Sequence, residues 1–307
     1  MAGLIVLEKM LMLIILMMVG FSAAKLGWVD AAFNQVASRL VTNIFIACTI
    51  AGSVMNVEPL LSGSELLLAV GAIFLTFLLG GAIGWAVSRC LPLERHERNV
   101  AWLSIFFMNN VFVGFPVVEA VFGADAIFCA SLSNLPFNIL LYTVGVANLR
   151  SGEGRGRVTL REMFSVPLIA TLVAILLFLT RLPVPGLVAD VVSTLGAATV
   201  PMSMLIIGIS LSRVPIRSAL GDWRAYVVSL TRLILCPVAA WLVMGLFLPH
   251  GGTILGVYTV TAACPCAAMI TILSIRFGAD DSFASKINFL STVLSALTLP
   301  LVTFFLL

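Results

Sequence analysis

Charged side chains are scarce in this sequence of 307 residues. Only 10% of the residues are Asp, Glu, Lys or Arg, whereas 61% are hydrophobic. Soluble domains carry about a quarter of their residues as charged side chains, so this chain has no sizeable aqueous domain that could act as an enzyme. Histidine is also rare: His96 and His250 both fall in predicted loops. This placement argues against a histidine proton relay through a membrane.

Long apolar stretches take the place of the missing charge. A membrane-spanning helix needs about 20 mostly apolar residues, and ten such stretches follow one another with short connections. We predict an all-α membrane protein of ten transmembrane helices. The first stretch, with Glu8 and Lys9 inside it, is interpreted as a retained span and not as a signal peptide. The stretches cover roughly residues 3–23, 37–56, 66–88, 100–122, 126–149, 163–180, 188–211, 225–247, 252–275 and 284–306.

Positive charge is nearly absent from every second connection, where Arg181 is the exception. The connections after spans 3, 5 and 7 each contain at least three arginines. Because Lys and Arg collect on the cytoplasmic side, we predict a multi-pass protein of the plasma (inner) membrane with both termini outside. Arg232 and Lys286 are interpreted in the same way, as residues near the inner interface. Topological anchoring explains the basic residues, so we expect no nucleic-acid partner.

The six cysteines are scattered, and most lie inside apolar stretches, which is typical of cysteine as a small apolar residue. We expect no disulfide framework. Cys264 and Cys266 flank Pro265, and two thiolates would suit Cu(I). Copper pumps that use this motif also need large nucleotide-binding domains, which this chain lacks. The sequence therefore predicts no metal site and no cofactor.

Three landmarks occur in the same order in the two halves of the chain. The glycine-rich and charged residues 150–161 separate these halves as a linker, so we predict repeats over 1–149 and 162–307. Each repeat would hold five spans, and an odd number makes the two enter the membrane in opposite directions, as in many secondary transporters. The landmarks are Trp85, Leu91-Pro92 and Phe122-Gly123-Ala124-Asp125, then Trp241, Leu248-Pro249 and Phe277-Gly278-Ala279-Asp280.

Two spans at matching places in the repeats contain helix-breaking residues. Span 4 holds Gly114 and Pro116, and span 9 holds Pro265. A simple proline kink would explain either proline alone, but the matched pair favours two broken helices. Backbone groups freed at a break cannot face lipid, so they must line a polar cavity or pack in protein. Half-helices beginning near Pro116 and Pro265 would offer their positive N-termini to a carboxylate.

These breaks define the candidate substrate-binding residues. Asn134 and Asn43 are weaker candidates, because an asparagine in a span often only joins neighbouring helices. Glu119, just past the first break, is a candidate for binding a coupling ion; the alternative is that it reaches the outer interface. The candidate substrate-binding set is Asn109, Asn110, Gly114, Pro116, Cys264, Pro265, Cys266, Asn43 and Asn134.

The same motifs resemble the auxin efflux carrier family over essentially the whole chain. The similar segments are Asn109-x-x-Phe112-x-Gly114-x-Pro116 in span 4, Leu195-Gly196 to Pro201 and Gly208 in span 7, and in spans 9 and 10 Pro265, Phe277-Gly278-x-Asp280, Ser291-Thr292-x-x-Ser295 and Thr298-Leu299-Pro300. The resemblance implies a ten-helix carrier of organic anions that works by alternating access, with spans 4 and 9 crossing. Bacterial members are similar to malonate and malate carriers, and bile-acid–sodium symporters are more distantly related.

What the resemblance implies for single residues is limited. Asn109 matches the asparagine of span 4 in that family, and Pro116 and Pro265 match its crossing prolines. The thiols of Cys264 and Cys266 depart from the small apolar residues expected there. The leading interpretation is a secondary transporter of small carboxylates, such as malonate or another dicarboxylate. A gated anion channel on the same scaffold is the alternative.

The partners expected from this interpretation are a small carboxylate and the lipid bilayer. Proton coupling, sodium coupling and transport without a coupling ion all stay open at this point. The oligomeric state stays open as well, with a homodimer through scaffold helices as one alternative. An integral membrane enzyme has no support, because no catalytic dyad lies at membrane depth.

Overall fold

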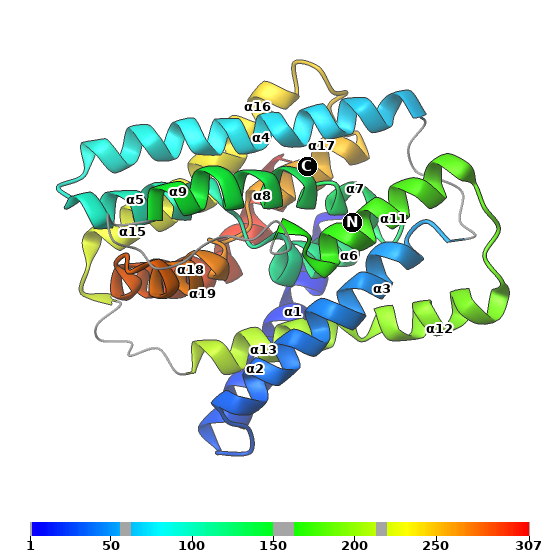
Figure 1. Ribbon diagram of the computed structural model, residues 1–307, viewed down its shortest axis with the longest axis horizontal. Coiled ribbons are helices and arrows are strands. Elements are labelled where there is room, and N and C mark those ends of the chain that lie inside the picture. The colour runs from blue at the N-terminus through cyan, green and yellow to red at the C-terminus, as the bar shows by residue number, and fades with distance from the viewer. Residues whose placement is uncertain (1, 56–62, 150–162, 213–219, 307) are drawn as a thin grey trace. The chain divides into compact units, whose positions relative to one another are not determined.

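A computed structural model describes residues 2–55, 63–149, 163–212 and 220–306 (Figure 1). Within these ranges every named element is helical, so the all-α prediction is confirmed. The predicted linker, residues 150–161, lies outside the described residues. Each of the ten apolar stretches contains helix. Several apolar helices in one chain are typical of a multi-pass membrane protein.

Six helical segments of the described residues are long and apolar enough to cross a membrane. The other apolar helices are shorter, and two of them, Thr253–Ala262 and Ala268–Phe277, divide the predicted span 9. Ten crossings in two inverted repeats therefore stay a prediction. The six long segments are Ala32–Gly52, Glu65–Cys90, Ala126–Leu149, Gly186–Leu211, Trp223–Met244 and Asp281–Leu306.

The chain divides into two compact units, and each takes segments from both sides of the predicted linker. The first unit consists of Met1–Gly71, Val111–Asn134 and Phe164–Arg213. The second consists of Ala72–Asn110, Leu135–Met163 and Val214–Leu307. These units are not the two predicted halves, which nothing in the structure tests.

Close backbone packing holds the first unit together. Helices α1 and α13 are extensive neighbours, and a Cβ atom at Gly208 would lie 1.9 Å from the carbonyl oxygen of Met17. Glycine is required for that approach, as at many contacts between membrane helices. The helices of this unit are α1 (Ala2–Lys25), α2 (Ala31–Leu40), η1 (Val41–Phe45, a π-helix), α3 (Ile46–Gly52), α6 (Phe115–Phe122), α7 (Ala126–Ser131), α11 (Val166–Thr180), α12 (Gly186–Ala197) and α13 (Thr199–Leu211).

Aromatic rings fill the core of the second unit. The Phe107 ring packs against Phe106 with centroids 4.5 Å apart and against Phe137 at 5.6 Å, and Phe77 lies beside all three. The helices that belong to this unit for most or all of their length are α4 (Gly63–Cys90), α5 (Arg95–Phe106), α8 (Asn134–Leu140), η3 (Leu141–Gly145), α9 (Val146–Leu149), α15 (Trp223–Leu230), η4 (Thr231–Leu235), α16 (Cys236–Met244), α17 (Thr253–Ala262), α18 (Ala268–Phe277) and α19 (Asp281–Leu306).

The repeated Phe-Gly-Ala-Asp sequence ends a helix in both places. Gly123 ends α6 with a φ of 89°, and Gly278 ends α18 with a φ of 72°. Side chains other than glycine are strained at such angles. The aspartate that follows precedes the next helix, and Asp280 caps α19 by accepting a hydrogen bond from the Phe283 amide at 2.8 Å. The shared tetrapeptide is therefore a helix stop in both places, and its second copy also caps the helix that follows; the Asp125 side chain makes no such cap hydrogen bond.

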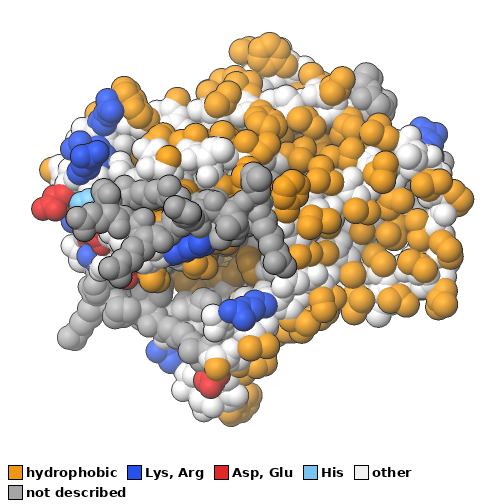
Figure 2. Space-filling model, in the orientation of Figure 1, with side chains coloured by type: hydrophobic (Ala, Val, Ile, Leu, Met, Phe, Trp, Pro, Cys, Tyr) orange, Lys and Arg blue, Asp and Glu red, His pale blue; other side chains and the backbone are white. Residues whose placement is uncertain are grey.

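Large apolar side chains lie on the outside, as expected of a protein that faces lipid. Hydrophobic side chains cover much of the face shown in Figure 2. Among the most exposed are Leu67, Leu187 and Leu246, each more than three-quarters exposed. In water such a surface would be unfavourable, whereas lipid tails match it.

Candidate functional site

Span 4 is broken, but not at the residue that the sequence suggested. Helix α5 ends at Phe106, residues 107–109 are extended, and winding resumes with the π-helix η2 (Asn110–Gly114). Pro116 lies in the first turn of α6, which continues from η2. The expectation that a half-helix begins near Pro116 is therefore wrong, because the break comes before Asn110.

Span 9 is broken around its proline, as predicted. Helix α17 ends at Ala262 and α18 begins at Ala268. Pro265 lies in the extended stretch between them. The half-helix α18 thus has its N-terminus just after the break.

The two extended stretches pair with each other inside the second unit. Met108 and Cys266 form an antiparallel bridge. The Asn109 amide donates to the Pro265 carbonyl at 2.8 Å, and the Ala267 amide donates to the Phe107 carbonyl at 3.0 Å. Each break therefore satisfies backbone groups of the other, as a break away from water requires. We call residues 107–109 and 265–267 together the crossing.

Five of the predicted binding residues lie in or beside the crossing. Asn109 and Pro265 take part in its backbone pairing, and Asn110 is buried directly after it. Cys264 and Cys266 are fully buried. The Cys264 thiol, just beyond the end of α17, donates to the carbonyl of Val260 in that helix at 3.4 Å.

The remaining predicted residues belong to the first unit, whereas the crossing belongs to the second. Asn134 donates from Nδ2 to Thr171 Oγ1 at 3.1 Å, which joins α8 to α11. This is the link between helices that the sequence left as its alternative role. Asn43 lies in η1 with an exposed side chain. Gly114 and Pro116 lie in η2 and α6.

Glu119 is the acidic residue of α6. One of its carboxylate oxygens, Oε2, is buried and has no hydrogen-bond partner among the described residues. A buried carboxylate oxygen without a partner is costly. This environment suits a group that takes up a proton or a cation. The role of Glu119 as a coupling-ion residue stays a prediction.

Arg232 is the residue that the sequence analysis placed wrongly. It was expected near the inner interface, but its side chain is only 2% exposed and lies against the crossing. It sits in η4, a π-helical turn of the kind that often marks functional sites. An arginine within the apolar stretch 225–247 was the available signal, because ionisable groups inside a membrane are rare and usually functional.

The Arg232 guanidinium holds both helix ends that lead into the crossing. Nη1 donates to the Ile105 carbonyl at 2.9 Å, and Nε donates to the Cys264 carbonyl at 3.1 Å. Nη2 donates to the Ala262 carbonyl and to the Met108 sulfur. These carbonyls lie in the last turn of α5, at the end of α17 and just beyond it, where helices leave acceptors without partners.

Ser291 of α19 also supports the crossing and was named in the sequence only as part of a motif. Its hydroxyl accepts a hydrogen bond from the Cys266 amide at 3.2 Å. The same hydroxyl donates to the carbonyl of Asn288 in its own helix at 3.2 Å. Helix α19 therefore anchors one side of the broken span 9.

Ligands for a cation are few at the crossing. In the part of the chain that the structure describes, no three His, Cys, Asp or Glu side chains are grouped so that they could hold a metal ion. Arg232, which contacts Met108 of the crossing, is a guanidinium and cannot serve as a metal ligand. Positive charge, a helix N-terminus and small polar groups instead suit an anion.

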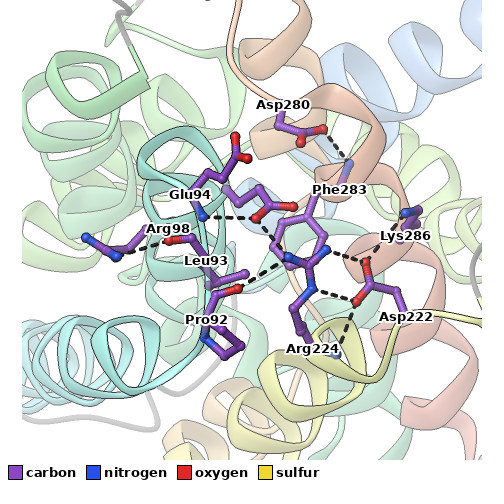
Figure 3. Close-up of polar contacts among 10 residues, drawn as sticks. Pro92, Leu93, Glu94, Arg98, Asp222, Arg224, Asp280, Phe283 and Lys286 are labelled. Atoms are coloured by element: carbon purple, nitrogen blue, oxygen red, sulfur yellow. Dashed lines mark hydrogen bonds and ion pairs between the residues drawn. The ribbon is translucent and has the colours of Figure 1, made fainter.

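An ion-pair network lies at the N-terminal ends of α5, α15 and α19, within the second unit (Figure 3). Arg224 contacts Glu97 at 2.9 Å and Asp222 at 3.0 Å, and Lys286 contacts Asp222 at 3.5 Å. The hydrogen bond from Arg224 holds the pKa of the Asp222 carboxyl below its ordinary value. Lys286, about a quarter exposed, is thus an ion-pair partner at a helix end.

The sequence is similar to a family of membrane transport proteins and to two proteins named as transporters. Residues 5–303 match the family described as membrane transport protein. An uncharacterized transporter of Methanothermobacter thermautotrophicus is 28% identical over 297 residues, with 96% of each chain covered. An uncharacterized transporter of Methanocaldococcus jannaschii is 26% identical over 308 residues, covering 96% of this chain and 97% of its own. With a family match over nearly its whole length and a pair of broken helices, this chain belongs to the membrane transport protein family, the family of the auxin efflux carriers.

Proposed function

We propose that the protein is a secondary transporter of small organic anions, chiefly carboxylates, with its binding site at the crossing. The observation that carries this proposal is the buried pairing of the two broken spans beside Arg232. This side chain is buried and donates to the Ile105, Ala262 and Cys264 carbonyls beside the crossing. No carboxylate lies within ion-pair distance of Arg232 among the described residues.

An alternating-access mechanism is part of the proposal, and the division into units supports it. The first unit holds predicted spans 1 and 2 together with spans 6 and 7, which are their counterparts in the other half. The second unit holds most of span 3 and all of spans 8, 9 and 10. Such a sharing of counterparts is what inverted repeats produce.

Transport by purified protein in proteoliposomes is the test. Counterflow of a panel of mono- and dicarboxylates, malonate among them, should show exchange that saturates. Failure of every carboxylate to exchange would count against the proposal. A gated anion channel on the same scaffold would instead give conductance far above carrier turnover, without exchange.

Asn109→Ala provides the matched variant for the crossing. We expect it to abolish exchange while the protein still elutes as a folded species, because Asn109 lies where the two breaks pair. Asn34→Ala is the control, since Asn34 binds Ser210 within the first unit at 2.9 Å. A fully active Asn109→Ala protein would remove this residue from the site.

A further inference from the structure

We propose that Arg232 determines the charge selectivity of the carrier, by keeping the crossing positive toward a bound anion. This inference rests on the proposed function and deepens it. It concerns a residue that reaches the crossing from η4, outside both broken spans.

Two helix ends balance the charge of Arg232. Helices α5 and α17 end beside its guanidinium, and each helix C-terminus carries roughly half a negative charge. Together they offset about one positive charge, which explains how an arginine is buried here without a carboxylate. The guanidinium and these two helix ends are thus close to neutral as a group.

A third helix end contributes the charge that remains at the crossing. Helix α18 begins at Ala268, directly after the Pro265–Ala267 stretch, and adds roughly half a positive charge from its N-terminus. Ser291 adds a neutral hydroxyl. The crossing as a whole is therefore slightly positive, and it favours an anion.

Removal of the guanidinium would free three carbonyl oxygens that it binds in the wild type. The carbonyls of Ile105, Ala262 and Cys264 would then face the crossing as uncompensated negative ends. The sign of the site would reverse, and a bound anion would be repelled. The loss of binding free energy would be twice as large for a dianion as for a monoanion.

The size of the effect follows from Coulomb's law. One unit charge about 8 Å away, in a medium of effective dielectric constant about 20, changes the binding of a monoanion about 30-fold. The same change acts on a dianion by about the square of this factor, or about 1,000-fold. The preference between the two should therefore shift by about 30-fold.

The experiment compares Arg232→Met with Arg232→Lys in proteoliposomes. Apparent affinities are measured for lactate and malonate, each as substrate or as competitor of the transported carboxylate. We expect Arg232→Met to lose about 30-fold more affinity for malonate than for lactate. The lysine variant keeps the charge but loses the fork of donors, so its ratio should stay within about threefold of the wild-type ratio, whatever happens to its turnover.

A purely structural role would give a different pattern. It would lower the yield of folded protein or the turnover of both variants, while the ratio of affinities stayed unchanged. Arg232→Gln is the second neutral variant, because its amide can still donate to one carbonyl. If both neutral variants fail to fold while the lysine variant folds and keeps the wild-type ratio of affinities, the arginine is structural and the inference is overturned.

The result also separates this inference from the proposed function. A wild-type protein that binds and exchanges no carboxylate overturns both. A wild-type carrier whose neutral variants keep the lactate-to-malonate ratio overturns only the role of Arg232.

Discussion

The hydrogen bond from the Cys266 amide to Ser291 is the contact by which α19 supports the crossing, and its removal can be predicted in detail. Ser291→Ala leaves the buried Cys266 amide without its acceptor. An orphaned buried donor costs about 1–3 kcal/mol. The loss of the Ser291 hydroxyl's own bond to Asn288 should add little, because that carbonyl belongs to the same helix.

Ser295→Ala is a closely matched control on the same helix. Ser295 is also buried, and its hydroxyl donates to the carbonyl three residues before it at 2.7 Å, as the Ser291 hydroxyl does. Ser295 differs in accepting no amide from the crossing in the described contacts. Any difference between the two variants therefore measures the bond to Cys266.

Thermal unfolding in detergent, followed by tryptophan fluorescence, is the assay. A loss of 1 kcal/mol lowers the Tm by about 2–4 °C in proteins of 150–250 residues, and by somewhat less in a chain of this size. We therefore expect Ser291→Ala to lower the Tm by about 2–8 °C and Ser295→Ala to lower it by less than about 2 °C. Equal shifts in the two variants would refute the reasoning.

Three further predictions concern other parts of the molecule. Because its folded pKa is lowered by Arg224, Asp222 should stabilise the fold above pH of about 4, and this stabilisation is lost as pH falls through the lowered value; Asp222→Asn should lack that acid-sensitive part in Tm measurements from pH 7 to pH 3. Gly278→Ala should cost about 1 kcal/mol because of its φ of 72°, whereas Gly186→Ala, in open space at the start of α12, should keep or slightly raise the Tm. Glu119→Gln should alter the pH or sodium dependence of exchange, and an unaltered dependence would remove Glu119 as a coupling group.

Local signals in the sequence predicted the helical architecture well. The apolar stretches predicted an all-helical membrane protein, and the two Phe-Gly-Ala-Asp segments marked true helix ends. Both signals act within one segment: the first through burial in lipid, the second through the backbone angles that only glycine adopts easily. Such signals need no knowledge of the rest of the fold.

The position of the first break could not be read in the same way. Pro116 is the strongest helix breaker of span 4, yet it lies inside a helical run that begins at Asn110. The true break, at residues 107–109, contains neither glycine nor proline. It is stabilised by backbone bonds to residues more than 150 positions away, and a pairing of that kind leaves no local pattern.

The burial of Arg232 could not be predicted from the sequence for a related reason. Charge patterns along the chain indicate which side of the membrane a loop faces, but not what surrounds a residue inside a span. Burial of Arg232 depends on α5 and α17 ending at the same place. The meeting of these two helix ends is set only when the second unit folds, so the sequence carries no local sign of it.

The backbone pairing at the crossing tolerates some changes of sequence and not others. Because residues 107–109 and 265–267 bond through backbone groups, their side chains can change while the bonds persist. A single insertion or deletion in either stretch would instead turn its side chains to the opposite face. Substitution in these stretches therefore leaves the backbone pairing in place, whereas a change in the number of residues in either stretch disrupts its register.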